Sequence, residues 1–270
     1  MADGGIMHLQ RILSALLLIP LFLLLVQFGS LLHFTLLVGV VVVLAAWEFS
    51  RLCPLGTDGW LSILIVLGAL SWYAATLWAG NLAGLLALLT GMALLRTILV
   101  RAEFRVSVLQ GAWMVLGVAY VGGLMSFFSL LRGLDDGRQL IYYLACTTWA
   151  GDTGAFYVGS RWGRRPLCPR ISPKKTVEGA VAGVLTTVLL AVAGSAWIWP
   201  RLPWGRAAGV GLVLAVVGIA GDLCESAVKR AALAKDSGGI IPGHGGVLDR
   251  LDSVMFAGPA LYALIWIGWV

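Results

Sequence analysis

Residues Leu31 to Trp47 read LLHFTLLVGVVVVLAAW, an apolar run without Asp, Glu, Lys or Arg. Its hydrophobic residues are continuous rather than alternating, which indicates a membrane-spanning helix and not a strand of a transmembrane barrel. The whole chain has this character, because 60% of its 270 residues are hydrophobic, 12% are charged and the mean hydropathy is +0.93. Soluble domains average about 45–50% apolar residues. The composition therefore predicts an all-α, polytopic integral membrane protein.

A membrane-crossing helix needs roughly 20 mostly apolar residues, and nine segments approach that length. The first follows Arg11, lacks a small-residue cleavage site and leads directly into further spans, so we expect it to be retained rather than removed as a signal peptide. The nine predicted spans are Ile12 to Gly29, Leu31 to Trp47, Gly59 to Gly80, Asn81 to Leu95, Val106 to Leu131, Gln139 to Ser160, Ala180 to Trp199, Trp204 to Gly221 and Ser253 to Val270.

The basic residues predict the orientation of these spans. With nine crossings, 15 of the 19 Lys and Arg residues fall on the side of the N-terminus. Because loops rich in Lys and Arg stay in the cytoplasm, we expect a cytoplasmic N-terminus and a location in the inner cell membrane. Two long polar loops, residues 161–179 and 222–252, then share the cytoplasmic face and can form one site.

The second of these loops concentrates charge in an otherwise apolar chain. Residues 220–253 read AGDLCESAVKRAALAKDSGGIIPGHGGVLDRLDS. Asp222, Glu225, Ser226 and Lys229 recur at the spacing of one helical face, so we expect them to extend the eighth span into the cytoplasm. The glycines that follow allow the backbone to approach a ligand closely.

Acidic residues stand on both sides of this glycine-rich segment. Asp222 and Glu225 precede it, and Asp249 and Asp252 follow it at the start of the last helix. Carboxylates beside a phosphate-binding loop are a usual way to hold Mg²⁺, which prefers oxygen ligands. The alternative is a surface loop held by the ion pairs Asp236–Lys235 and Asp249–Arg250.

The first loop contains the sequence SPKKTVEG, from Ser172 to Gly179. Ser172 followed by Pro173 is typical of a helix start, which would place Lys174 and Lys175 in the first helical turn. Backbone N–H groups and two ammonium groups would then converge on a polyphosphate. The alternative is ordinary cytoplasmic charge beside a span.

Two further residues are candidates. Asp152 lies in WAGDTGAFYVG, at the cytoplasmic end of the sixth span, and an intramembrane carboxylate is a functional candidate by default. A structural hydrogen bond to a neighbouring helix is the alternative. His244 lies between glycines and can contact phosphate or orient a carboxylate.

At these residues the sequence resembles CDP-diacylglycerol synthase, also called phosphatidate cytidylyltransferase. The C-terminal signature of that family, S-x-x-K-R-x(4)-K-D-x(5)-P-G-H-G-G-x-x-D-R-x-D, is matched from Ser226 to Asp252. SPKKTVEG and WAGDTGAFYVG also resemble segments of the family. The chain departs from the family pattern at Val177, where an aromatic residue is expected, and at Phe156-Tyr157, whose order is swapped. These motifs cover the last half of the chain.

The resemblance implies that CTP and phosphatidate react to CDP-diacylglycerol and pyrophosphate, at the membrane surface and with Mg²⁺, with a second cation as a further expectation. It divides the chain into residues 1–105 with spans one to four, and a catalytic region of residues 106–270 with spans five to nine. The implied Mg²⁺ ligands are Asp222 and Asp249, with Asp252 and Asp152 as further or outer ligands. The implied substrate-binding residues are Ser172, Lys174, Lys175, Lys229, Arg230, Lys235, Asp236, His244 and Arg250.

The sequence fits two other classes of protein less well. A transporter of an anionic solute would place its polar residues near the bilayer midplane and show paired broken helices, whereas the charge here lies at one face. A CDP-alcohol phosphotransferase would carry a DG…AR…G…D…D pattern, which is absent. The expected partners are the two substrates and membrane lipid, with no nucleic acid; only a general base rate favours a homodimer.

Overall fold

The computed structural model describes residues 2–78, 80–100, 102–243 and 245–270, and these residues are mainly helical. The prediction of an all-α architecture is confirmed. The helices are α1 Ala2–Phe28, α2 Leu31–Arg51, α3 Gly59–Leu77, α4 Leu82–Leu99, α5 Phe104–Gly117, α6 Leu124–Arg132, α7 Gly137–Trp162, α8 Val177–Trp197, α9 Trp204–Ala231 and α10 Asp252–Trp266. The shorter elements are the π-helix η1 Val118–Gly123, the 3-10 helix η2 Leu248–Arg250 and the strands β1 Pro166–Cys168 and β2 Ser172–Thr176.

Each of the nine predicted spans coincides with helical structure, since α5, η1 and α6 together form the fifth. Within the described residues, six helical segments are long and apolar enough to cross a membrane. The three that fall short are α1, whose described apolar part is Leu16–Phe28, α7, which is less apolar along its length, and α10, which has 15 residues. The six segments are α2, α3, α4, residues 104–132, α8 and α9.

Large apolar side chains are exposed on α1 and on several of these six segments, among them Leu17, Leu36, Ile98 and Leu189. Water would disfavour such surfaces, whereas lipid tails solvate them, so the chain is a membrane-embedded protein.

The described chain divides into two compact units. The first holds residues 1–129 and 231–250, and the second holds residues 130–230 and 251–270. The division predicted at residue 105 is of another kind, because it separates residues 1–105 from an expected catalytic region. It stays a prediction. Each unit is described by itself.

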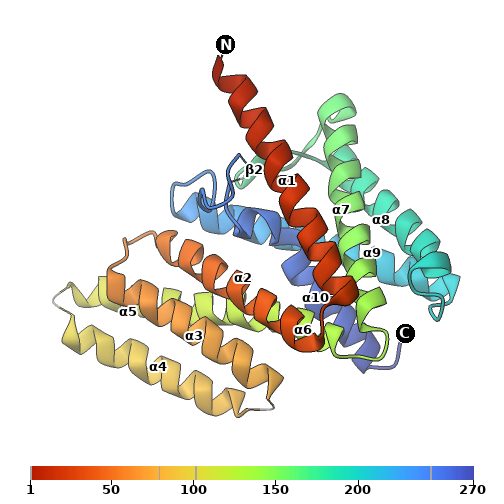
Figure 1. Ribbon diagram of the computed structural model, residues 1–270. Coiled ribbons are helices and arrows are strands. Elements are labelled where there is room, and N and C mark those ends of the chain that lie inside the picture. The colour runs from red at the N-terminus through yellow and green to blue at the C-terminus, as the bar shows by residue number, and fades with distance from the viewer. Residues whose placement is uncertain (1, 79, 101, 244) are drawn as a thin grey trace. The chain divides into compact units, whose positions relative to one another are not determined.

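In the first unit, α2 pairs with α3, and α4 pairs with α5 (Figure 1). Asp58 caps α3 by accepting a hydrogen bond from the Leu61 N–H, and its other oxygen is 2.6 Å from the guanidinium of buried Arg96 in α4. This contact joins the C-terminal end of α4 to the loop before α3. Phe49 of α2 stacks on Trp113 with ring centroids 4.7 Å apart, which fixes α5 against α2.

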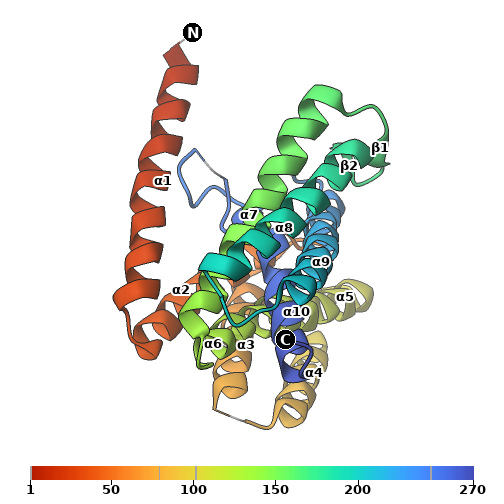
Figure 2. The same cartoon turned by 90° about the vertical axis from the view of Figure 1, so that its right-hand side faces the viewer.

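In the second unit, α7 and α8 lie side by side, with the β1–β2 hairpin beside their ends (Figure 2). Glycines permit the close approach of the two helices, because a Cβ at Gly183 would lie 3.1 Å from the Ala155 Cβ. Further along the pair, the Tyr143 hydroxyl donates to the Ala191 carbonyl at 3.0 Å. α9 packs against α8 at Gly211, and α10 begins against α9 at Gly221.

Candidate active site

Three carboxylates gather where α10 begins beside α9. Asp222 and Glu225 are one turn apart on α9, and Asp252 is the first residue of α10. One carboxylate oxygen from each lies within 4.8 Å of the other two. Gly221 makes the approach feasible, because a Cβ there would lie 2.6 Å from the Asp252 carbonyl oxygen. The structure thus brings Asp222, Glu225 and Asp252 together, and metal binding by these residues stays a prediction.

The ionised form of Asp252 is disfavoured in this cluster. Burial, and after it the negative charge of Asp222, raises the pKa of Asp252 to about 8. Three carboxylates at this spacing offer only oxygen ligands, which suits a hard divalent cation such as Mg²⁺. The donor set therefore fits the predicted cofactor.

Basic side chains contact the same cluster. Lys175 of β2 forms an ion pair with Asp222, and the Lys229 ammonium lies 2.5 Å from Glu225, one turn earlier on α9. The Arg230 Nε donates to the Ile171 carbonyl at 3.1 Å, which ties the end of α9 to the hairpin. The two polar loops predicted to share a face therefore do meet, at Lys175 and Asp222.

The helix start predicted at Ser172 is wrong. Ser172–Thr176 is strand β2, antiparallel to β1, and α8 begins at Val177. The cap is Thr176, whose hydroxyl accepts from the Gly179 N–H. Glu178 then accepts from the N–H groups of Arg164 and Arg165, which closes the hairpin onto the helix.

This correction changes the role of the lysines. Alternate residues of a strand point to opposite sides, so Lys174 is exposed while Lys175 is half-buried against Asp222. The two ammonium groups therefore do not converge at a helix N-terminus. Pro173, which lacks an N–H, is tolerated because a two-stranded hairpin consists of edge strands only.

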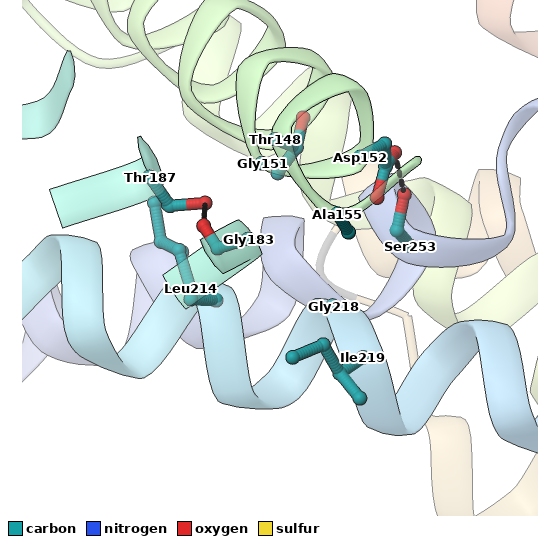
Figure 3. Close-up of a pocket in the computed structure, with 11 residues that line it drawn as sticks. Thr148, Gly151, Asp152, Ala155, Gly183, Thr187, Leu214, Gly218, Ile219 and Ser253 are labelled. Carbon is teal, nitrogen blue, oxygen red and sulfur yellow. Dashed lines mark hydrogen bonds between the residues drawn. The ribbon is translucent and has the colours of Figure 1, made fainter. Parts of the chain in front are cut away.

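Asp152 of α7 lies at one end of a small pocket between α7, α8, α9 and α10. The Ser253 hydroxyl donates to its carboxylate at 2.8 Å, and the two side chains point toward each other (Figure 3). Since Ser253 follows Asp252, this bond links α7 to the residue beside the acidic cluster. The pocket is lined by Thr148, Gly151, Asp152, Ala155, Gly183, Thr187, Leu214, Ala215, Gly218, Ile219 and Ser253.

Asp249 lies in the first unit, on η2, and is held by the loop before it. Its Oδ2 accepts hydrogen bonds of 2.9 Å from the Ser237 N–H, the Ser237 hydroxyl and the Gly246 N–H. Because Asp222 and Asp252 belong to the second unit, the role of Asp249 as a metal ligand stays a prediction.

The remaining predicted residues lie around this loop or the hairpin. Lys235, Asp236 and Arg250 are exposed, and Ser172 opens β2. His244 lies outside the described residues. The alternative ion pairs Asp236–Lys235 and Asp249–Arg250 stay predictions, and the hydrogen bonds from Ser237 and Gly246 are contacts that the structure shows for Asp249.

Comparison with known proteins agrees with the motifs. The sequence model of the cytidylyltransferase family matches residues 9–268. The chain belongs to the cytidylyltransferase family. It is 36% identical to phosphatidate cytidylyltransferase of Bacillus subtilis strain 168 over 263 residues, which cover 95% of this chain and 97% of the relative.

Two further relatives carry the same name. The chain is 32% identical to phosphatidate cytidylyltransferase of Staphylococcus haemolyticus over 258 residues, 94% of this chain and 98% of the relative. It is 39% identical to that of Staphylococcus aureus strain COL over 166 residues, which cover 62% of this chain and 63% of the relative. The resemblance predicted from the sequence motifs is therefore confirmed at the level of the cytidylyltransferase family.

The sequence motifs did not single out Glu48. This carboxylate lies in the last turn of α2, is 1% exposed and contacts the loop that holds Asp249. A signal was present, because Glu48 is the only Asp or Glu between residues 31 and 51, in an otherwise apolar segment.

Proposed function

We propose that this protein transfers the cytidylyl group of CTP to phosphatidate, giving CDP-diacylglycerol and pyrophosphate. The observation that carries the proposal is the cluster of Asp222, Glu225 and Asp252 with Lys175 and Lys229 in contact. It occurs in a chain that matches enzymes named phosphatidate cytidylyltransferase over 94–95% of its length. Neither those names nor the described residues favour the transporter alternative.

The proposed reaction is a phosphoryl-type displacement. A phosphate oxygen of phosphatidate attacks the α-phosphorus of CTP, and the bond from this phosphorus to the oxygen that bridges it to the β-phosphorus breaks. The electron pair leaves with that oxygen as pyrophosphate. The attacking phosphate monoester is already ionised near neutral pH, so the main barrier is repulsion between two polyanions.

Mg²⁺ is the proposed cofactor, held by Asp222, Asp252 and Glu225, with Asp249 as a further predicted ligand. When bound, it would supply charge neutralisation and a fixed orientation for the phosphates. A second cation stays part of the proposal, because the acidic residues outnumber the ligands that one hydrated Mg²⁺ needs from protein.

The chain's own cations provide the rest of the electrostatic stabilisation. Lys175 and Lys229 are each held in place by a carboxylate of the cluster, so their ammonium groups are fixed before substrate arrives. We propose that they contact the CTP phosphates or the phosphatidate headgroup, together with Lys174 and Arg230. Ser172, Lys235, Asp236, His244 and Arg250 are proposed to shape the pocket. Asp152, held by Ser253, is proposed as an outer carboxylate of the site.

We also propose that the chain crosses the membrane nine times. Contacts within each unit support this number. Two residues that touch lie on the same side of the membrane, so an even number of crossings must separate them. Glu48 at the end of α2 contacts Ser237, and six helical segments separate them if α7 crosses. Asp136 before α7 likewise accepts from the Trp199 indole N–H after α8, at 3.0 Å. Both contacts join loops on one side of a membrane only if α7 crosses it.

The terminal helices fit the same arrangement. In the first unit, the Ser14 hydroxyl of α1 donates to the Pro242 carbonyl at 3.3 Å, which supports an N-terminus on the side of the glycine-rich loop. In the second unit, α10 begins beside Gly221, and Trp269, three residues beyond the end of α10, lies where a Cβ at Gly209 would collide with its ring. The segment from Asp252 to Trp269 therefore extends along α9 for most of the depth of that helix.

This topology places the site where the chemistry needs it. The basic loops would face the cytoplasm and its CTP, and the surrounding helices would give access to phosphatidate in the inner cell membrane. A homodimer stays a prediction, which the mass of the protein in detergent, measured by light scattering, would check.

The direct test is Mg²⁺-dependent release of pyrophosphate from CTP and phosphatidate by the purified protein. We expect release to require both substrates and the cation, and Asp222→Asn to reduce the turnover number by about 100-fold or more. Asp135→Asn, an exposed carboxylate elsewhere in the second unit, is the matched control. A purified, folded protein without this activity would refute the proposal.

A further inference from the structure

Glu48 connects α2 to the glycine-rich loop almost 200 residues later in the chain. Its Oε2 accepts a 3.1 Å hydrogen bond from the Ser237 hydroxyl and a 3.0 Å bond from the Leu248 N–H. All three residues are buried and belong to the first unit. The two bonds hold the loop at both of its ends, at Ser237 just after Asp236 and at Leu248 just before Asp249.

Two glycines of the loop are required by this contact. A Cβ at Gly238 would lie 2.6 Å from Glu48 Oε1, and a Cβ at Gly246 would lie 2.6 Å from Glu48 Oε2. Real Cβ atoms do not approach oxygen so closely, so only glycine lets the loop close around the carboxylate. The sequence suggested that the loop glycines make room for a ligand, but the neighbour of Gly238 is the Glu48 carboxylate, and the neighbours of Gly246 are the Ser237 hydroxyl and Glu48.

Two residues that contact Glu48 also bond to Asp249. The Ser237 hydroxyl lies 3.1 Å from the Glu48 carboxylate and 2.9 Å from the Asp249 carboxylate, and the Ser237 N–H also donates to Asp249. Gly246, which contacts Glu48, donates its own N–H to Asp249. Ser237 therefore bonds to both carboxylates, and Gly246 lies against Glu48 while its N–H donates to Asp249.

We propose that Glu48 is a positioning residue, which holds Ser237 at one end of the loop and Gly246 to Leu248 at the other, so that the Asp249 carboxylate is presented in a single orientation. The inference rests on the proposed function in one respect, namely that Asp249 acts in the cytidylyl transfer. A carboxylate suits this task because its hydrogen bonds to a hydroxyl and an N–H are charge-assisted and stronger than those of a neutral acceptor. An ionisable side chain in an apolar helix costs free energy, so a functional role for it is expected.

The test compares Glu48→Ala, Glu48→Gln and Ser237→Ala with the unaltered protein. Glu48→Gln keeps one oxygen that can accept both bonds, whereas Glu48→Ala removes them. Ser50→Ala is the matched control, because Ser50 is buried in the same turn of α2 but bonds to Trp47 and Ser62 instead of the loop. Two quantities are measured: hydrogen exchange of the loop amides, and the Mg²⁺ concentration that gives half-maximal pyrophosphate release.

We expect Glu48→Ala to speed exchange at Ser237, Gly246 and Leu248 and to raise the half-maximal Mg²⁺ concentration by about 10-fold, with turnover falling by about 100-fold, because a displaced catalytic group is costly. Glu48→Gln should stay within about 3-fold of the unaltered protein, since an amide oxygen can replace these bonds. Ser237→Ala should speed hydrogen exchange at Gly246, as Glu48→Ala does. A residue needed only for folding would lower the active fraction without shifting the Mg²⁺ requirement.

The outcomes separate the two proposals. Unchanged loop exchange in Glu48→Ala, or a shift equal to that of Ser50→Ala, would overturn the positioning role. If Glu48→Ala does not fold, Ser237→Ala still decides it through exchange at Gly246, because this variant removes the hydroxyl that joins Glu48 to Asp249. If the unaltered protein releases no pyrophosphate, the proposed function fails, while the exchange comparison still shows whether Glu48 holds the loop.

Discussion

Lys175 of strand β2 forms an ion pair with Asp222 of α9, so a strand and a helix whose paired residues are 47 positions apart in the sequence meet at the acidic cluster. The pair fixes a positive charge beside the carboxylates that we propose hold Mg²⁺. An anionic substrate arriving there would meet an ammonium group already in position, which reduces the reorganisation needed during the reaction.

Replacement of Lys175 should therefore lower the rate of catalysis more than the loss of an exposed charge does. We expect Lys175→Met to lower kcat/KM for CTP by about 100-fold, the scale of one lost donor to developing charge. The measurement is steady-state pyrophosphate release at saturating phosphatidate. Arg170→Met, which removes an exposed charge from the turn of the same hairpin, should change kcat/KM by less than about 3-fold. Equal losses in the two variants would contradict a specific role for Lys175.

The Lys229–Glu225 pair should show an asymmetry in stability. Glu225 is 1% exposed and Lys229 is 13% exposed, so Lys229→Met leaves a buried carboxylate next to Asp222 and Asp252 and should lower the free energy of unfolding by about 3–5 kcal/mol. Glu225→Gln also strands a charge but relieves repulsion in the cluster, so its cost should be smaller. Unfolding in mixed detergent micelles without Mg²⁺ measures both.

The double variant Glu225→Gln, Lys229→Met provides the control for that comparison. With neither charge left, it should regain part of the stability that Lys229→Met loses, because the two residues are coupled. Strictly additive losses would show that the pair contributes nothing as a pair.

Mg²⁺ affinity should rise with pH because of Asp252. Burial and the nearby Asp222 charge raise the pKa of this carboxyl to about 8, so at neutral pH a proton competes with the cation. We expect the dissociation constant for Mg²⁺ to fall as pH rises from about 6 to about 8 and then to level off. Isothermal titration over this range measures it, and Asp252→Asn should remove most of the slope.

The same shift predicts how stability without Mg²⁺ depends on pH. The folded state binds the Asp252 proton more tightly than the unfolded state, so this contribution to stability is complete below about pH 4 and is lost as pH rises through about 8. Adding Mg²⁺ should reverse the trend near pH 8. A cation effect that is independent of pH would argue against Asp252 as a ligand.

Sequence reasoning predicted the helices well, because a continuous apolar run leaves few alternatives to a helix in lipid. It also placed Asp222, Glu225 and Lys229 on one face, since helical spacing alone decides that. It failed at Ser172, where a serine followed by proline resembles a helix start. The actual N-cap of α8 is Thr176, because residues 172–176 pair with the strand that begins at Pro166 and the helix starts only after them. A local sequence pattern does not reveal such pairing.

The contacts of Glu48 show a second limit of the same kind. A lone carboxylate in an apolar segment signals function, but its partners Ser237 and Leu248 lie almost 200 residues further along the chain. Only the packing of the first unit reveals which loop it holds. Long-range pairs of this sort depend on tertiary structure, whereas the acidic and basic motifs were visible because each is confined to one short segment.

Gly221 offers a test of how precisely the acidic cluster must be assembled. A Cβ at this position would lie 2.6 Å from the Asp252 carbonyl oxygen and 2.8 Å from the Phe256 ring. Backbone cannot move aside as a side chain can, so Gly221→Ala should push the start of α10 away from α9. We expect turnover to fall by about 10–100-fold, because small displacements of catalytic groups are costly, and the Mg²⁺ requirement to rise.

Gly205→Ala in the first turn of the same helix is the control for Gly221→Ala. Nothing lies within 4 Å of a Cβ at Gly205, so this variant should keep full turnover and gain up to about 1 kcal/mol of stability from the better helix former. Activity assays and unfolding in detergent should be run on both variants. If Gly221→Ala keeps normal turnover and a normal Mg²⁺ requirement, close contact between α9 and the Asp252 backbone is not needed for the chemistry, and the cluster of Asp222, Glu225 and Asp252 would lose its assigned role as the cation site.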